Sequence, residues 1–292
     1  MLIANKYRIL DKLGAGQFGE IFKGINIRTS EVVAIKIELK ENDTKMLKRE
    51  TQIYQYLHSE GNAPGFAQLK HFGVNNSCNY LVMSLLDKSL TDLCKIYLAF
   101  SLKTVLLIGI QLVERVKFVH EKGLIHRDIK PDNFLVGQVA AEDTIHLIDF
   151  GFTKRYTNDA GEHCKERLCS SIIGTPNFIS ENIHWHIDPS RRDDMESILY
   201  ILLYLFLGGL YWQNITDLDK IRDMKHDLVY DKELPKVFNL FLVHCKNLTY
   251  EQTPDYTYLL NILKEAIPNK NVKHKFEWTG ASPPMLCKAK QG

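Results

Sequence analysis

The first part of the chain alternates hydrophobic and polar positions with the period of β-strands. Segments rich in β-branched and aromatic residues are separated there by turn-forming residues. The predicted strands are 7–13, 19–27, 32–38, 68–74 and 78–85. A helical pattern over 43–57 interrupts them, and a loop with glycine and proline at 61–65 follows it. We therefore expect a small β-sheet packed with one helix.

After about Asp87 the spacing of hydrophobic residues becomes helical. A helix is predicted from the N-cap Ser101 to about Lys122. Further predicted helices cover 192–207, 217–226, 234–246 and 256–266. The apolar run 198–212, which two glycines interrupt, is shorter than the ~20 residues of a membrane span. It therefore predicts a helix buried inside a large helical unit.

The composition is that of an ordinary globular protein, with 45% hydrophobic and 25% charged residues. The net charge of +2 provides no basic surface of the kind that binds nucleic acid or anionic membranes. The six cysteines form no C-x-x-C pair, and the amino terminus carries no export signal, so free thiols in the cytoplasm or nucleus are expected. His184 and His186, with Cys164 and Cys169, provide no paired ligand set, which favours packing or loop roles over metal binding.

A glycine-rich turn lies between the first two predicted strands. It reads Gly14-Ala15-Gly16-Gln17-Phe18-Gly19 and continues into Glu20 and Ile21 as strand. The missing side chains of such a turn let backbone N–H groups approach phosphate oxygens. A dinucleotide-binding motif would have a helix after its third glycine and is therefore disfavoured. A glycine-rich hairpin without a ligand remains open on this motif alone.

Lys36 stands in the apolar strand 33–36, and a carboxylate is available to pair with it. Met46, Glu50, Ile53 and Leu57 are spaced to share one face of the following helix, so Glu50 interrupts a hydrophobic stripe. Either charge buried alone would cost several kcal/mol. The sequence therefore predicts a Lys36–Glu50 ion pair that presents the ammonium to nucleotide phosphates, with an ordinary surface salt bridge as the alternative.

The most specific stretch is His126-Arg127-Asp128-Ile129-Lys130-Pro131-Asp132-Asn133, whose chance match is on the order of 10⁻⁸ per starting point. In this pattern Asp128 accepts or orients the proton of an attacking hydroxyl, and Lys130 neutralises charge on a transferred γ-phosphoryl group. Asn133 is a predicted Mg²⁺ ligand. Asp149, in Asp149-Phe150-Gly151 after an apolar strand, is a second one. Lys130, two residues after the aspartate, favours serine/threonine over tyrosine specificity.

These motifs resemble those of eukaryotic protein kinases, and a further set resembles the casein kinase I group. That set comprises 81–93, 131–135, 190–197, Trp212-Gln213, 254–259, and Ser180-Glu181-Asn182 at the Ala-Pro-Glu position. The resemblance runs from about residue 5 to Trp278. It implies an α+β bilobal fold, with a small antiparallel β-sheet N-lobe carrying one helix over 1–86, a mainly helical C-lobe over 87–279, and a short flexible tail over 280–292.

The resemblance also implies which residues bind ATP and Mg²⁺. The hinge would run from Ser84 to Leu86, with Met83 as the gate beside the adenine. The apolar residues around the base would be Leu13, Ile21, Ala34, Leu135 and Ile148. Asp194 would brace the backbone of His126 and Arg127, although a simple N-terminal helix charge remains an alternative for it.

The chain departs from the casein kinase I pattern where that group reads a phosphate or acidic side chain on its substrate. The positions are Asn177, Asn214 and Asp223. Arg127 and Lys154, two cations of the group's second anion site, are retained, while Ser170 occupies the third position. We expect phosphate-primed substrates to gain little advantage.

The sequence thus predicts a monomeric serine/threonine protein kinase that acts on protein substrates, acidic ones included, in the cytoplasm or nucleus. The resemblance also implies that many members of the group carry a long inhibitory carboxy-terminal extension; since this chain has almost no sequence after 279, we expect activity without prior activation. An inactive kinase fold that serves as a scaffold is disfavoured, because every catalytic residue type is present. A small-molecule phosphotransferase is disfavoured by Lys130-Pro131 and by the long segment between Asp149 and Ser180.

Overall fold

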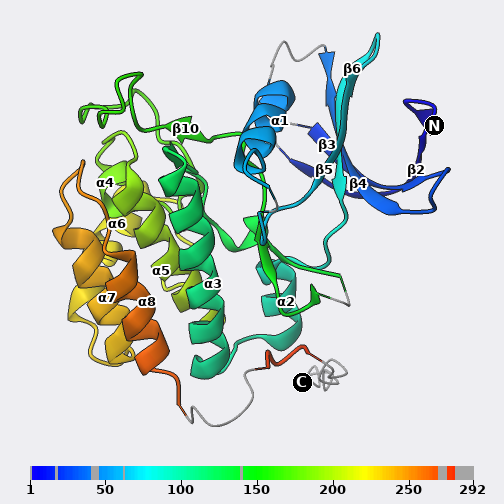
Figure 1. The fold of residues 1–292 in the computed structure, drawn as a ribbon. Coiled ribbons are helices and arrows are strands. Elements are labelled where there is room, and N and C mark those ends of the chain that lie inside the picture. The colour runs from blue at the N-terminus through cyan, green and yellow to red at the C-terminus, as the bar shows by residue number, and fades with distance from the viewer. Residues whose placement is uncertain are drawn as a thin grey trace.

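The structure is a computed structural model that describes residues 2–16, 19–40, 46–61, 63–138, 141–268 and 275–279. A β-sheet with one helix forms one part, and a larger group of helices forms the other (Figure 1). This arrangement confirms the predicted α+β fold, with an antiparallel N-lobe sheet, a helix and a helical C-lobe. Among the predicted features, Gln17, Phe18 and the tail 280–292 lie outside the described residues.

The sheet is antiparallel and has the strand order β1-β2-β3-β4-β6-β5. Its strands are β1 (Leu2–Ile3), β2 (Tyr7–Gly16), β3 (Gly19–Asn26), β4 (Val32–Leu39), β5 (Leu69–Val74) and β6 (Cys78–Ser84). Helix α1 (Met46–Leu57) packs on β5 and β6. The central position of β4, between β3 and β6, buries the lysine that it carries.

The helical lobe is built around α5, whose residues are buried on nearly every side. The described helices there are α2 (Leu90–Tyr97), α3 (Leu102–Glu121), α4 (Glu181–His184), α5 (Arg191–Leu207), α6 (Leu218–Asp227), α7 (Lys236–Asn247) and α8 (Tyr256–Glu265). Helix α3 packs against both α5 and α8 (Figure 1). The apolar segment that starts at Ile198 is therefore a core helix, as predicted. In the described part of the chain, no helix combines the length and the hydropathy needed to cross a bilayer.

Short elements carry the loops that face the sheet. Strand β8 (Phe134–Val136) pairs with β9 (Ile145–Leu147), and β7 (Leu124–Ile125) pairs with β10 (Lys154–Arg155). A 3-10 turn, η2 (Pro131–Asn133), joins the first of these hairpins to the preceding loop. A second 3-10 turn, η4 (Leu228–Tyr230), follows α6.

Two local expectations need correction. The buried face of α1 consists of Leu47, Glu50, Thr51, Tyr54 and Leu57, so Met46 and Ile53 lie at its border rather than in its centre. Helix α2 was not predicted, although Ser89 caps it and Asp92 completes a capping box. The first difference arises because neighbouring elements decide which side of a short amphipathic helix is covered, whereas the second was within reach of the local capping signal.

Candidate active site

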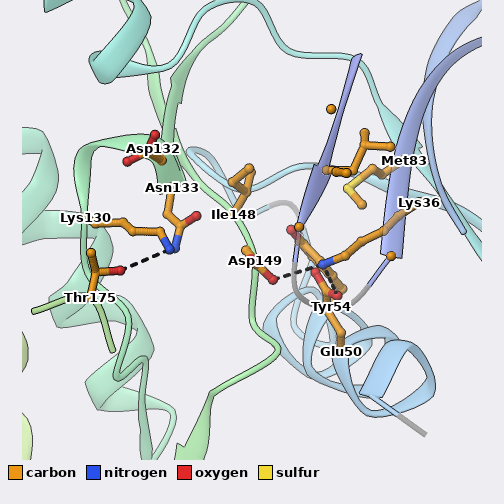
Figure 2. A pocket seen from close by; sticks show the side chains of 15 residues that line it. Lys36, Glu50, Tyr54, Met83, Lys130, Asp132, Asn133, Ile148, Asp149 and Thr175 are labelled. Atoms are coloured by element: carbon orange, nitrogen blue, oxygen red, sulfur yellow. Dashed lines mark hydrogen bonds and ion pairs between the residues drawn. The ribbon is translucent and has the colours of Figure 1, made fainter. Parts of the chain in front are cut away.

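The sequence motifs meet in a cleft between the sheet and the loops of the helical lobe (Figure 2). Its inner cavity has a volume of about 480 Å³. The lining is formed by Gly14, Ala15, Gly16, Gly19, Ile21, Lys36, Glu50, Tyr54, Met83, Lys130, Asp132, Asn133, Ile148, Asp149 and Thr175. An adjoining cavity of about 690 Å³ shares Gly14, Ile21 and Met83 with it, so the two are parts of one cleft.

The adjoining cavity contains the residues expected around the base. Leu13, Ile21, Ala34, Met83, Ser84, Leu86, Leu135 and Ile148 all line it. Most of these side chains are apolar, and they come from β2, β3, β4, β6 and β8 and from the residues just after β6 and β9, on both sides of the cleft. The surface suits a flat aromatic group held between the lobes.

Lys36 forms the polar centre of the inner cavity. Its Nζ lies 2.7 Å from Glu50 Oε2 on α1 and 3.0 Å from Asp149 Oδ1 (Figure 2). Burial would lower the pKa of Lys36, but the two carboxylates outweigh it and raise the pKa above its ordinary value. Burial would likewise raise the pKa of Asp149, and the Lys36 charge holds it below its ordinary value. The predicted Lys36–Glu50 pair is confirmed, and both Lys36 and Asp149 are charged at neutral pH.

The glycine-rich turn closes the cleft from the sheet side. A Cβ added at Gly14 or Gly16 would meet no atom within 4 Å, so backbone is open to the cavity there. Gly19 has φ +133°, and a Cβ on it would lie 2.0 Å from Ile37 O, so only glycine fits. Glu20 lines neither cavity, since its carboxylate pairs with Lys12.

Asp128, Lys130, Asn133 and Thr175 form one hydrogen-bonded group in the helical lobe. Lys130 Nζ lies 2.7 Å from Asp128 Oδ2 and 3.3 Å from Thr175 Oγ1. Thr175 Oγ1 donates to Asp128 Oδ1 at 3.0 Å, and Asn133 Nδ2 donates to the Asp128 backbone oxygen at 2.8 Å. The Asp128 carboxylate is thereby fixed beside a cation; Asp128 itself is buried and lines neither cavity, but the three side chains bonded to it are those of Lys130, Asn133 and Thr175 of the inner cavity.

Two residues of the site have left-handed backbone conformations that non-glycine residues rarely adopt, Arg127 at φ +70° and Asp149 at φ +65°. Asp194 of α5 holds the first of them, because its carboxylate accepts the backbone N–H of His126 at 2.7 Å and of Arg127 at 2.9 Å. Burial would raise the pKa of Asp194, but the hydrogen bond with His120 outweighs it and lowers the pKa. The bracing position expected for Asp194 is confirmed.

The oxygen atoms in the cleft fit a divalent cation. The Asn133 amide nitrogen is engaged by Asp128, so its carbonyl oxygen is the atom it can offer, and Asp149 adds carboxylate oxygen. Hard cations such as Mg²⁺ prefer such ligands. Asn133 and Asp149 are therefore the residues suited to hold the metal, as the sequence predicts.

Sequence reasoning missed three residues of the inner cavity. Tyr54 follows Glu50 by one helical turn, a spacing that could have indicated it. Asp132 lies inside the predicted motif, next to a proposed metal ligand. Thr175 had no local signal, because its contact with Asp128 joins segments 47 residues apart.

The positions that depart from the casein kinase I pattern lie outside the cleft. Asn177 accepts a hydrogen bond from Trp212 Nε1 through its backbone oxygen, and Asp223 pairs with Arg222. Lys154 Nζ lies 2.6 Å from Asp188 Oδ2, a carboxylate that Arg167 also contacts. Asn214 and Ser170 are exposed.

A search against protein-family models matches the protein kinase domain across residues 7–267. The matched range includes strands β2 to β6 of the sheet, the cleft and the helices α1 to α8. Proteins with this domain transfer phosphoryl groups, use ATP with a divalent metal, and act on protein substrates. The match extends over most of the chain and agrees with the geometry of the cleft, so this chain belongs to the protein kinase domain family.

Proposed function

We propose that this protein kinase transfers the γ-phosphoryl group of ATP to serine and threonine hydroxyls, with Mg²⁺ as its metal, and that it is of the casein kinase I type. The observation that carries the proposal is the convergence of Lys36, Lys130, Asn133 and Asp149 on one cavity, with Asp128 hydrogen-bonded at its edge. Phosphoryl transfer depends mainly on positioning and on electrostatic stabilisation, which this set of charges can supply.

Each residue has a distinct part in the proposed reaction. The backbone of the glycine-rich turn and the Lys36 ammonium bind and orient the triphosphate. Asp128 accepts the proton of the substrate hydroxyl, and Lys130 beside it stabilises charge on the transferred group. Asn133 and Asp149 would hold the metal, whose positive charge would offset the negative charge of the phosphates. The hinge residues Ser84 to Leu86 position the base.

The chain is proposed to be active as isolated. A kinase site requires its lysine–glutamate pair and its metal-binding aspartate to be in place together. Lys36 contacts both Glu50 and Asp149 here, and the ring of Phe150 packs edge-on against Tyr54 of α1. These contacts of α1 support the proposal that no prior activation step is needed. Nuclear and cytoplasmic pools both remain compatible with this proposal.

Phosphate-primed substrates are proposed to have little advantage. Asn177 and Asn214 bring no charge to the first anion pocket, and Asp223 brings a negative one that Arg222 offsets. The cation Lys154 of the second site is already paired with the buried Asp188. An incoming phosphate would have to displace that carboxylate, and this cost would cancel most of the binding free energy that the phosphate contributes.

A peptide-library assay with the purified chain, ATP and Mg²⁺ tests the proposal. We expect phosphate on serine and threonine and none on tyrosine, and loss of transfer in Asp149→Asn. The matched control is Asp143→Asn, an exposed carboxylate outside the cleft, which should transfer at the wild-type rate. Tyrosine phosphorylation, or full activity of the Asp149→Asn chain, would contradict the proposal.

Priming is tested with a peptide pair that differs only in a phosphoserine three residues before the target. We expect kcat/KM to differ by less than about fivefold, well under the ratio that a new charge-assisted contact worth about 2 kcal/mol would produce. A hundredfold preference for the primed peptide would contradict the proposal that the altered anion pocket gives primed substrates little advantage.

A further inference from the structure

A second lysine, Lys225 of α6, is fully buried in the helical lobe and lines neither cavity of the cleft. Its ammonium lies over the rings of Tyr200 and Trp212, at 4.8 and 5.5 Å from their centroids. Among the described residues, no carboxylate lies within ion-pairing distance of it. A buried charge without a counter-ion is costly, so a local requirement must keep it there.

The requirement is visible in the atoms that Lys225 contacts. Its Nζ donates to the backbone oxygens of Pro176 and Ile179, both at 2.7 Å, and lies 3.2 Å from His184 Nε2. An ammonium has three donors, and these three acceptors match them. Glu196 of α5, whose charge acts on Lys225, instead accepts hydrogen bonds from the Tyr200 hydroxyl and from the Glu181 backbone N–H.

The segment that Lys225 holds leads directly to the catalytic group. Trp212 Nε1 donates to Asn177 O at 2.9 Å. Trp212 and Lys225, which both follow α5 in the sequence, therefore bind three backbone oxygens of the segment 176–179. Thr175, the residue before this segment, contacts both Asp128 and Lys130. The preceding Gly174 has φ +102°, and a Cβ there would lie 2.9 Å from Arg127 O. The chain is thus fixed at both ends of this stretch.

We propose that Lys225 is a positioning residue for protein phosphorylation: its ammonium fixes the segment 176–179, and with it the preceding Thr175, as the platform on which the substrate peptide lies beside Asp128. The inference rests on the proposed function, because it assumes that a peptide hydroxyl is the acceptor. Lys225 contacts neither nucleotide-binding residues nor the metal ligands, so its effect falls on the peptide and not on ATP.

A lysine suits this task better than an apolar side chain would. The three backbone oxygens of 176, 177 and 179 point into the lobe, and each needs a donor there because buried carbonyls without one are destabilising. A long, flexible side chain that ends in three donors serves two of them at once. The aromatic faces of Tyr200 and Trp212 stabilise the cation from the other side.

The test compares wild type, Lys225→Met and Lys220→Met in steady-state peptide phosphorylation and in ATP binding. Methionine retains the length and apolar packing of lysine but loses the donors. We expect peptide kcat/KM of Lys225→Met to fall about tenfold or more, since two charge-assisted hydrogen bonds are lost, while the Kd for ATP stays within about twofold. Lys220, on the same helix, is 72% exposed, and its variant should match wild type.

Trp212→Phe provides a second variant if Lys225→Met does not fold. It keeps an aromatic ring but removes the donor to Asn177 O together with part of the buried ring, and we expect a smaller fall in peptide kcat/KM, about threefold, again with unchanged Kd for ATP. Unchanged peptide kinetics in the folded variants, or a parallel loss of ATP affinity, would overturn the inference. No peptide phosphorylation by wild type would instead contradict the proposed function itself.

Discussion

Lys36 and Lys225 are both buried lysines, 5% and 0% exposed, but their ammonium groups have different kinds of partner. Lys36 faces two carboxylates, Glu50 and Asp149, which raise its pKa. Lys225 faces backbone oxygens, an imidazole and two rings, and burial lowers its pKa to about 7. The Lys36 charge is stabilised by ion pairing, whereas the Lys225 charge is stabilised only by uncharged partners, namely carbonyl oxygens, an imidazole and two aromatic faces.

The different partner atoms of the two lysines correspond to the different parts of the structure that each lysine connects. Lys36 joins the two lobes, because Glu50 belongs to α1 and Asp149 to the loop after β9. Lys36 must also stay protonated if it is to bind nucleotide phosphates, and two neighbouring carboxylate charges keep it protonated. Lys225 holds only backbone within its own lobe, for which hydrogen-bond donors suffice. Burial of an ammonium is therefore no guide to catalysis; the partner atoms decide its role.

Lys36→Met should produce the largest effect. It leaves Glu50 buried without its cation, so we expect the free energy of unfolding to fall by about 3–5 kcal/mol and phosphoryl transfer to fall by about 10²–10³. Urea denaturation and a radiolabelled transfer assay measure the two. The exposed pair Lys117–Glu121 provides the control, since Lys117→Met should cost less than about 1 kcal/mol.

The double variant Lys36→Met with Glu50→Leu separates stability from catalysis. Removing both charges should restore most of the lost stability, since neither is then buried alone, but it should not restore transfer. A double variant as unstable as Lys36→Met would show that the ion pair contributes through packing, and the contrast with Lys225 would lose its basis.

Asp194 offers a counterpart to Lys225, because it holds backbone N–H groups as Lys225 holds backbone oxygens. In Asp194→Asn one acceptor oxygen is replaced by an NH₂ group that faces a donor. We expect a loss of about 1.5–3 kcal/mol in the free energy of unfolding, together with a lower kcat, because Arg127 is released from its strained conformation. The matched control is Asp219→Asn at an exposed carboxylate, and equal stability of the two variants would refute the bracing role.

The sequence predicted the partner of Lys36, but it did not predict that Lys225 is buried. A charge in an apolar strand and a carboxylate in an apolar helical stripe require each other, so the pattern of residues alone was enough to pair Lys36 with Glu50. Lys225 lies between Met224 and His226 on an amphipathic helix, where a lysine is ordinarily solvent-exposed. Its burial depends on the path of the segment 176–179, which no local pattern encodes.

The same reasoning applies to the site and the fold. The long elements and most of the cleft followed from periodicity and motifs, and α2 could have been found from its Ser89–Asp92 capping box. Thr175 could not, because its contacts with Asp128 and Lys130 arise from tertiary packing. The pairing of Lys154 with Asp188 was equally hidden, and it changes how the second anion site is interpreted.

The smallest expected effect is a pH dependence that distinguishes the two lysines. The folded-state pKa of Lys225, about 7, lies below its ordinary value of 10.5, so between these values the unfolded chain binds more protons and stability rises with pH. The unfolding free energy of wild type minus that of Lys225→Met should therefore increase by about 1 kcal/mol from pH 6.5 to pH 8. Lys36 has the opposite sign: its raised pKa contributes stability that is complete below 10.5, so the Lys36 ammonium itself adds no pH dependence in this range. The titratable groups around Lys225 are His184, Glu196 and Lys246; burial is the first cause that lowers the pKa of His184, so that imidazole stays largely neutral above pH 6.5 in wild type and in Lys225→Met. Urea denaturation of these two chains at the two pH values measures the difference, and a flat result would mean that the carbonyl oxygens and rings keep the Lys225 ammonium charged despite burial.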